Sequence, residues 1–330
     1  MTDAAGARKP ARPPSATTVA SNAFVEAHID AAREIGRQLA DEIDDPGRFA
    51  AAIRAGLEGL ADPVSLAGLR LVAPGIGPSL GVRLPLLEAV HRSLIRELRG
   101  VRAARLLPVA EALAHDPIRE LRWFSCWLLA RVLPDEPEQA WQVLRGLASE
   151  ADDWISVDTL ATTVGRGILA EPYRWTELEQ LVYSPSRWER RLVGSTIATI
   201  PFVDRTAGRT QDVADRGIAL VSLLIGDSEP DVQKALSWAL RNLSAIDGAG
   251  VTAFCRREAE RAVATSDGAR AWVVRDALSK LDAADAAEIR ALLTGIRRTP
   301  RPANTSAAAS TAAAFVTVRD DASAPRAPLT

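Results

Sequence analysis

Helical periodicity covers almost all of the interior of this 330-residue chain, and it recurs in paired segments. Apolar residues return every three or four positions, the spacing of one face of an α-helix. No segment alternates in the manner of a half-buried β-strand. Paired units begin near residues 116, 153, 186 and 230, roughly 33–44 residues apart, a period typical of helical repeats. The sequence therefore predicts an all-α helical-repeat solenoid.

Helix starts are marked by an acidic or hydroxyl residue beside proline, as at Asp116-Pro117, Glu136-Pro137, Ser184-Pro185 and Glu229-Pro230. The predicted helices cover residues 22–44, 46–60, 84–99, 102–114, 117–133, 136–151, 153–170, 176–184, 186–200, 211–226, 230–246, 249–265, 271–281 and 284–297. The repeat length is that of HEAT-like units, whose stacked pairs form a convex and a concave layer. The concave layer is where such solenoids bind extended partners.

Composition divides the chain into three parts. Residues 1–20 are rich in Ala, Pro, Thr and Arg without periodicity, and we expect a disordered leader there. Residues 21–298 carry the solenoid. Residues 299–330 are rich in Pro, Ala, Ser and Thr, and we expect a disordered tail.

The composition also excludes several classes of protein. No run approaches the roughly 20 apolar residues of a membrane span, and the N-terminus lacks an apolar signal core. Two cysteines, Cys126 and Cys255, are too few for a disulfide framework, and their apolar contexts predict buried thiols. These features predict a cytoplasmic protein. The formal net charge of −2 argues against coating nucleic acid by bulk charge alone.

Trp154 and Asp158 form the most informative pair in the chain. Four residues apart on the predicted helix 153–170, they lie on one face about a turn apart. The apolar stripe of that helix consists of Val157, Leu160, Ala161, Val164 and Ile168. At 100° per residue, Trp154 and Asp158 lie about 60–100° to one side of that stripe. An aromatic and an acid at the edge of a buried face are candidates for a site.

Two later helices also turn notable residues away from their apolar stripes. In 230–246, Trp238 projects to the opposite side together with Lys234 and Arg241, either to pack on the next repeat or to meet a ligand. In 186–200, Arg187 and Arg191 lie on the far side with Gly194 and Ala198 above them. Arginines beside small residues predict a surface that a phosphate backbone can approach.

Each of these residues alone has a more ordinary explanation. Trp154 taken alone is more often a core or inter-repeat residue, and Arg191 alone is more often a solvated charge. The three histidines are scattered, and no Cys/His cluster has metal-ligand spacing. There is no phosphate-binding glycine loop and no serine-hydrolase or zinc-protease motif. The sequence therefore predicts neither a metal nor a cofactor.

In combination, the residues resemble a known family. Asp-Trp-x-x-x-Asp at 153–158, Trp-x-x-Arg at 188–191 and Lys-Ala-x-x-Trp-x-Leu-Arg at 234–241 occur in the order found in the AlkD-like alkylpurine DNA glycosylases, which are HEAT-like proteins. The segments 81–85 and 116–123 also resemble the N-terminal half of that family. The resemblance covers roughly residues 80–280.

The resemblance implies a role for each matching residue. Asp158 corresponds to the catalytic aspartate, and Trp154 and Trp238 to the tryptophans that cradle the deoxyribose of the damaged nucleotide. Arg191 corresponds to an arginine that contacts the DNA backbone. Beside it, Arg187, Lys234 and Arg241 are further candidates for DNA binding.

The implied function is hydrolysis of the N-glycosidic bond of cationic N3- or N7-alkylated purines in duplex DNA. Members of this family are thought to act without a base-binding pocket, which extends the expected substrates to bulky adducts. The implied enzyme is a monomer that needs no metal and no membrane. The alternative from another class is a non-catalytic DNA-binding or scaffold protein on the same solenoid.

Overall fold

The computed structural model describes residues 15–322, with side chains described to residue 314. Within that range it contains sixteen α-helices, several short 3₁₀ turns and no strand, which confirms the predicted all-α class. The helices are α1 (Ala16–Gln38), α2 (Pro46–Glu58), α3 (Pro63–Val72), α4 (Leu84–Glu97), α5 (Leu107–Ala114), α6 (Arg119–Val132), α7 (Pro137–Ser149), α8 (Trp154–Ala170), α9 (Arg174–Gln180), α10 (Arg187–Val203), α11 (Gln211–Leu224), α12 (Pro230–Leu243), α13 (Gly248–Thr265), α14 (Gly268–Ala277), α15 (Ala283–Leu292) and α16 (Ala307–Ala322).

Most of the predicted helix starts are confirmed, and the side chains explain them. Helices α7 and α12 begin at Pro137 and Pro230, where the missing N–H of proline costs nothing because the first backbone N–H groups of a helix have no partner within it. Helix α8 begins after Asp153, whose carboxylate accepts hydrogen bonds from the backbone N–H groups of Ile155 and Ser156. This cap fixes where the first turn of α8 lies.

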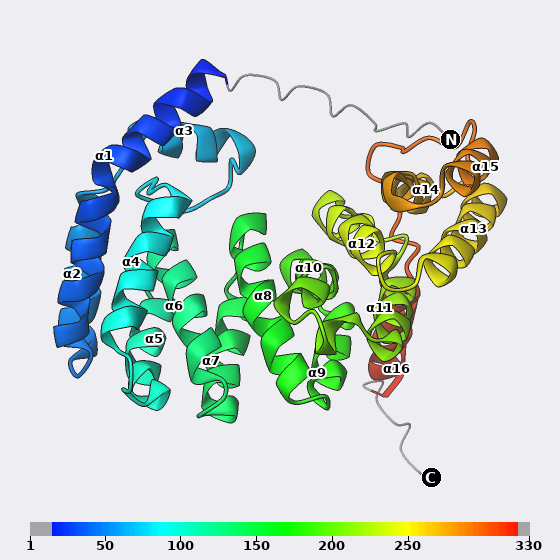
Figure 1. The fold of residues 1–330 in the computed structure, drawn as a ribbon. Helices are drawn as coiled ribbons and strands as arrows, with labels where there is room; N and C mark the ends of the chain where they lie inside the picture. Colours follow the sequence, from blue (N-terminus) through cyan, green and yellow to red (C-terminus); the bar gives the residue numbers. More distant parts are fainter. Residues whose placement is uncertain (1–14, 323–330) are drawn as a thin grey trace, which may run out of the picture.

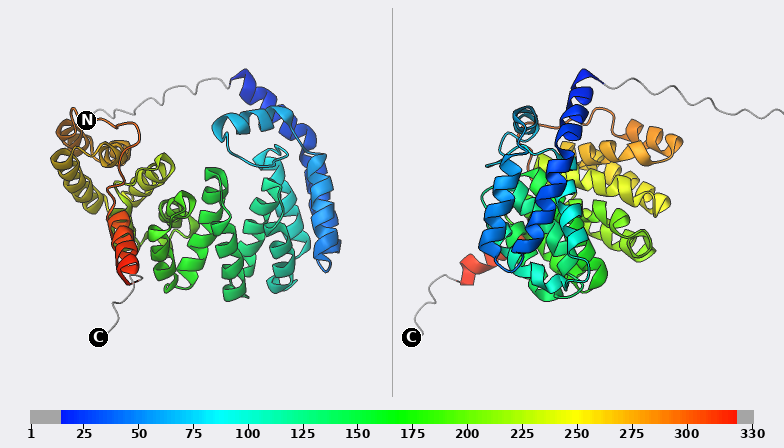
Figure 2. Two further views of the ribbon diagram at one scale, coloured as in Figure 1. Left: turned by 180° about the vertical axis from the view of Figure 1, so that it is seen from behind. Right: turned by 60° about the vertical axis from the view of Figure 1, so that its left-hand side comes forward.

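The helices stack in two curved layers. Helices α4, α6, α8, α10, α12 and α14 pack side by side in chain order and form one layer. The helices between them in sequence, among them α5, α7, α11 and α13, pack behind as the second layer. Figure 1 shows that the array bends into an arc, with α3 near one end of its open side and α14 near the other. Seen from behind, the array shows the same arc, with α16 in the foreground where it packs against α11 (Figure 2, left).

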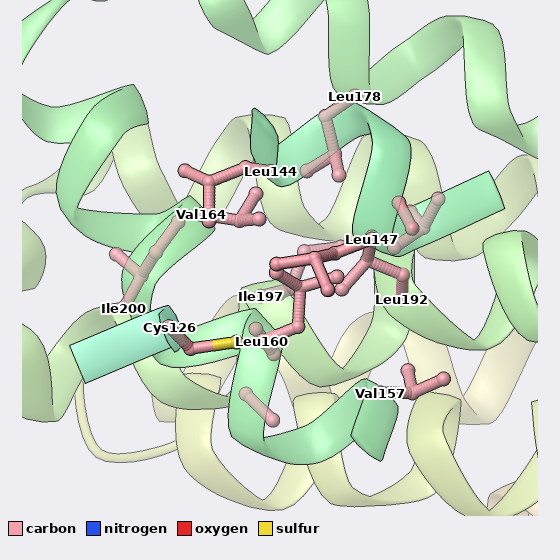
Figure 3. Close-up of a cluster of buried hydrophobic side chains, with 14 of the residues drawn as sticks. Cys126, Leu144, Leu147, Val157, Leu160, Val164, Leu178, Leu192, Ile197 and Ile200 are labelled. Atoms are coloured by element: carbon pink, nitrogen blue, oxygen red, sulfur yellow. The ribbon is translucent and has the colours of Figure 1, made fainter. Parts of the chain in front are cut away.

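The hydrophobic core runs between the two layers. The predicted stripe of α8 is confirmed, since Val157, Leu160, Ala161, Val164 and Ile168 are all at most 4% exposed. In Figure 3, side chains of α8 meet those of the neighbouring helices, with Cys126, Leu144 and Leu192 among them. Burying one such aliphatic side chain stabilises the fold by roughly 1.5–3 kcal/mol. The core thus holds α6, α8 and α10 in a fixed register.

The two ends of the chain differ from the sequence-based prediction. The predicted disordered leader covers residues 1–20, but α1 begins at Ala16 behind Ser15, whose hydroxyl accepts from the backbone N–H of Thr18. Residues 1–14 lie outside the described part of the chain. No helix of that part is long and apolar enough to cross a lipid bilayer.

The predicted disordered tail over 299–330 contains a helix instead, α16, which packs against α11. Ser306 and Ala308 are each 1% exposed, and the Thr305 hydroxyl bonds to the buried carboxylate of Asp267. Alanine favours helix without needing an amphipathic pattern, so the periodicity gave no signal. Residues 323–330 lie outside the described residues.

Candidate functional site

The start of α8 is held by a buried ion pair. The side chain of Arg119, 1% exposed, reaches from α6 to the carboxylates of Asp153 at 3.0 Å and Asp152 at 2.5 Å. Asp153 is also the N-cap of α8. The helix that carries Trp154 and Asp158 is therefore fixed at its first residue, and the two side chains follow one turn apart on the same face.

Asp158 is held from α10 by two side chains. The guanidinium of Arg191 donates Nε–H to Oδ1 at 3.1 Å and Nη2–H to Oδ2 at 2.8 Å. The hydroxyl of Ser195, one turn further along α10, donates to Oδ1 at 2.6 Å. Such bidentate, charge-assisted pairing fixes the plane of the carboxylate. The Asp158 side chain remains 20% exposed, so one edge of it stays open to an incoming group.

Arg191 does not lie where the helix pattern predicted. The residue is 4% exposed, and its Nη1–H donates to the backbone carbonyl of Asp231 at 2.7 Å. The predicted phosphate approach at Gly194 is wrong for the same reason. A Cβ at Gly194 would lie 2.8 Å from the Cβ of Ala235, because α12 occupies that space. One helix's periodicity does not show which of its polar faces the next repeat covers.

Trp154 is set apart from the other tryptophans of the chain. The other seven lie in the hydrophobic core or pack against it, whereas Trp154 is half-buried outside that cluster. Its indole N–H donates to the backbone carbonyl of Val72 at 3.2 Å, and its ring centroid lies 5.9 Å from Cζ of Arg191. The indole therefore stands beside the Asp158–Arg191 pair with part of its surface free.

The remaining predicted site residues lie on α10 and α12, at differing degrees of exposure. Trp238 is half-buried against the core, and no hydrogen bond or ring stacking among the described residues joins it to Asp158. Lys234 is exposed, one turn before Trp238. Arg187 is exposed, 3.4 Å from Glu229, and Arg241 pairs with Asp276 of α14. Of the predicted set, the structure brings Trp154, Asp158 and Arg191 into direct proximity.

Comparison with known proteins identifies the family of the chain. A sequence model of the family described as "DNA alkylation repair enzyme" matches residues 53–281, more than half of the chain and the whole of this site. The chain belongs to the DNA alkylation repair enzyme family. That membership supports an enzyme's role in DNA repair, with DNA as the partner. Neither the curated proteins nor the solved structures give a match.

Two partners of these side chains were not predicted from the sequence. Ser195 stands four residues after Arg191, a spacing that places both on one face of α10, and this signal was available. No spacing in the sequence predicted that the carbonyl of Val72 contacts Trp154. It reaches Trp154 from 82 positions earlier in the chain, at the end of a helix that the sequence analysis missed.

Other titratable groups of the repair protein are buried away from the site. Burial raises the pKa of the Cys126 and Cys255 thiols to about 12, which confirms the predicted buried thiols and keeps them protonated. Burial, aided by the nearby Arg131 and Arg92, lowers the pKa of His91 to about 4. In the part of the chain that the structure describes, no group of acidic, histidine or cysteine side chains is arranged to hold a metal ion.

Two cavities of the described chain lie away from Asp158. One of about 300 Å³ is lined by Trp141, Leu178 and Glu189, and another of about 380 Å³ by residues of α5 and α7. Neither cavity is lined by Trp154, Asp158 or Trp238. The Asp158 side chain is 20% exposed and therefore reaches the surface.

Proposed function

We propose that this protein is a DNA glycosylase that hydrolyses the N-glycosidic bond of cationic N3- or N7-alkylated purines in duplex DNA. The observation that carries the proposal is the fixed, partly open carboxylate of Asp158, with an indole outside the core beside it. Family membership supplies the DNA and the repair role. The glycosidic bond and the alkylated purine are our inference from the chemistry of the site.

The chemistry suits a carboxylate that does not need to take a proton from the base. An N3- or N7-alkylated purine already carries a positive charge, so it leaves with the C1′–N electron pair and becomes neutral. The sugar is left as an oxocarbenium-like cation. A fixed negative charge beside C1′ stabilises this cation and positions the water whose oxygen bonds to C1′. The water proton is released to solvent, and the products are the free base and an abasic site.

Arg191 has a positioning role in this proposal. Three of its five N–H donors are engaged, two by Asp158 and one by the Asp231 carbonyl. In this arrangement the guanidinium orients the carboxylate and links it to α12. Because the residue is only 4% exposed, we assign Arg191 to orienting Asp158 before any contact with the DNA backbone.

The tryptophans and the exposed cations complete the proposed DNA surface. Indole rings present a negative face, which attracts the partly positive C–H edges of a reacting deoxyribose. Trp154 is available for this, and Trp238 contributes its exposed part. Lys234 and Arg187 are exposed and are assigned to phosphate contacts, with Arg241, two turns after Lys234 on α12, as a further cation.

The open surface supports action without a base-binding pocket. Because the site approaches the sugar, the size of the base is weakly constrained, and bulky adducts are included among the proposed substrates. We further propose a monomer that works in the cytoplasm on nucleoid DNA. Neither a metal nor a cofactor is used.

The alternative, a non-catalytic DNA-binding protein, is favoured by one specific observation. Another acid of the same layer, Asp276, is paired with an arginine in a similar way, so a pairing of this kind can serve packing alone. In that case the protein binds DNA with salt-dependent affinity and releases no base from any lesion.

The deciding experiment incubates the protein with duplex DNA that carries one N7-methylguanine or one N3-methyladenine. We expect release of the free methylated purine, measured by chromatography, well above spontaneous depurination. If the base is released no faster than from protein-free DNA, the glycosylase proposal is contradicted and the non-catalytic DNA-binding protein is favoured. A parallel duplex with a bulky N3 adduct measures how far substrate size matters.

A further inference from the structure

Helix α3 ends at the candidate site with an unusual surface. Its last turn exposes Leu71 and Val72, which are 82% and 61% exposed. Arg70 is also exposed and forms no ion pair with any described residue. The backbone carbonyl of Val72 accepts the indole N–H of Trp154. Two apolar side chains and a cation thus stand in solvent on the helical turn whose carbonyl accepts the indole N–H of Trp154.

The start of α3 is anchored firmly. Asp62, its N-cap, accepts from the Arg83 Nε–H at 2.6 Å and from the Val64 N–H at 2.9 Å. Gly81 passes so close that an added Cβ would lie 2.6 Å from Cβ of Leu66, and its φ of +75° suits glycine. These contacts tie α3 to the N-terminal end of α4.

The segment after α3 is anchored as well. Buried Glu120 of α6 accepts from the Ser79 hydroxyl at 2.8 Å and from the backbone N–H groups of Leu80 and Gly81 at 3.0 and 2.7 Å. Ala73, which follows the last turn, is 3% exposed. The exposed turn is therefore presented by a rigid support, and its apolar side chains are not the surface of a loose loop.

We propose that Arg70, Leu71 and Val72 form a DNA-contacting wedge, which we call the α3 wedge. This proposal rests on the proposed function, because it places the duplex against Asp158. Large exposed apolar side chains are uncommon on a protein surface unless a partner covers them. Proteins that hold distorted duplexes place such side chains against base steps and sugar edges, with an arginine following the backbone. Figure 1 shows α3 on the open side of the arc, where a duplex beside α8 would meet it.

The test compares two substitutions in the full-length chain, Leu71→Glu and Val64→Glu. Val64 is also an exposed apolar residue, at 67%, on the same face of α3, about 10 Å nearer its start. Both variants gain the same charge, but only position 71 adjoins Val72 and Trp154. Because both side chains are exposed, thermal unfolding should match the unmodified protein for both.

Affinity is measured by fluorescence anisotropy with a duplex that contains one tetrahydrofuran abasic-site analogue. We expect Leu71→Glu to raise Kd about tenfold and Leu71→Ala about threefold, while Val64→Glu changes it less than twofold. Equal losses at positions 64 and 71, or no loss at 71, overturn the wedge. The duplex contains no alkylated base, so this result is independent of catalysis. Absence of base release refutes the glycosylase instead.

Discussion

Asp158 on α8 and Asp276 on α14 have similar hydrogen-bond partners within one layer of helices, but they differ in what surrounds them. Each stands four residues after a tryptophan, Trp154 on α8 and Trp272 on α14. Asp158 is held by Arg191 and Ser195 of α10, and Asp276 by Ser237 and Arg241 of α12.

Burial and the tryptophan distinguish the two carboxylates. The side chain of Asp158 is 20% exposed and that of its arginine 5%, whereas Asp276 and its arginine are 43% and 24% exposed. Trp272 packs against the core, but Trp154 does not. An acid paired to a neighbouring helix of the layer therefore occurs twice in this solenoid. The Asp158–Arg191 pair is less exposed to solvent than the Asp276–Arg241 pair, and it lies beside an indole that is not packed in the core. We therefore assign catalysis to Asp158.

The largest difference between the two pairs is expected in the free energy of unfolding when the arginine of each pair is replaced. Arg191→Ala leaves a largely buried carboxylate without its partner and should lower the free energy of unfolding by about 3 kcal/mol. Arg241→Ala exposes an already half-solvated pair and should cost less than about 1 kcal/mol. Urea denaturation of both variants measures this difference. Equal losses would show that the two pairs do not differ in burial as described.

Replacing Trp272 should mainly reduce stability, whereas replacing Trp154 should mainly reduce activity. Trp272→Ala removes a ring packed against the core and should lower the free energy of unfolding by about 2 kcal/mol. Trp154→Ala should change it by less than about 1 kcal/mol, but slow base release about tenfold through loss of the indole beside the sugar. Denaturation measures the free energy of unfolding of both variants, and single-turnover kinetics measure their rate of base release. A large stability loss at Trp154 would make it a packing residue after all.

A third prediction concerns the close packing of α10 against α12 beside Asp158. Gly194→Ala forces a Cβ against Ala235 and should cost about 1–3 kcal/mol. Gly146→Ala, on α7 with open space around its Cβ, is the matched control and should be neutral or stabilising by up to about 1 kcal/mol. Thermal unfolding distinguishes them. If Gly194→Ala were also neutral, the tight seating of α12 behind Arg191 would be contradicted.

The smallest expected effect concerns the exposed cations. Lys234→Ala, beside the site, should reduce the slope of log affinity against log salt by about 0.9, the contribution of one phosphate contact. Lys280→Ala, an exposed lysine after α14, should leave the slope unchanged. Titrations over a range of salt concentrations measure both slopes. A reduced slope for Lys280 as well would extend the DNA surface to the region of Asp276.

The sequence predicted most of the fold because core-facing periodicity belongs to each helix separately. The stripe of α8 and the starts of α7 and α12 are examples. Helix α3 was missed because it is short, contains Gly68 and has no fully buried residue. Its stability comes from Asp62, Arg83 and Glu120, whose contacts span tens of residues.

The candidate site was predictable only in part. The spacing of Trp154 and Asp158 is local, so one helix was enough to place them together. Whether Arg191 faces solvent depends on where α12 packs, which the pattern of α10 does not contain. The partners Ser195 and Val72 likewise depend on how the repeats are stacked.

The central claim is that Asp158 supplies chemistry while Asp276, similarly paired, supplies packing. The most direct test measures base release from a duplex with one N7-methylguanine by Asp158→Asn and Asp276→Asn, with affinity for a tetrahydrofuran duplex measured alongside. We expect Asp158→Asn to slow release at least about 100-fold without weakening DNA binding, since a negative charge is removed. Asp276→Asn should stay within about threefold of the unmodified protein. Equal release by Asp158→Asn and the unmodified protein, or a loss of release matched by a loss of affinity, would contradict the assignment.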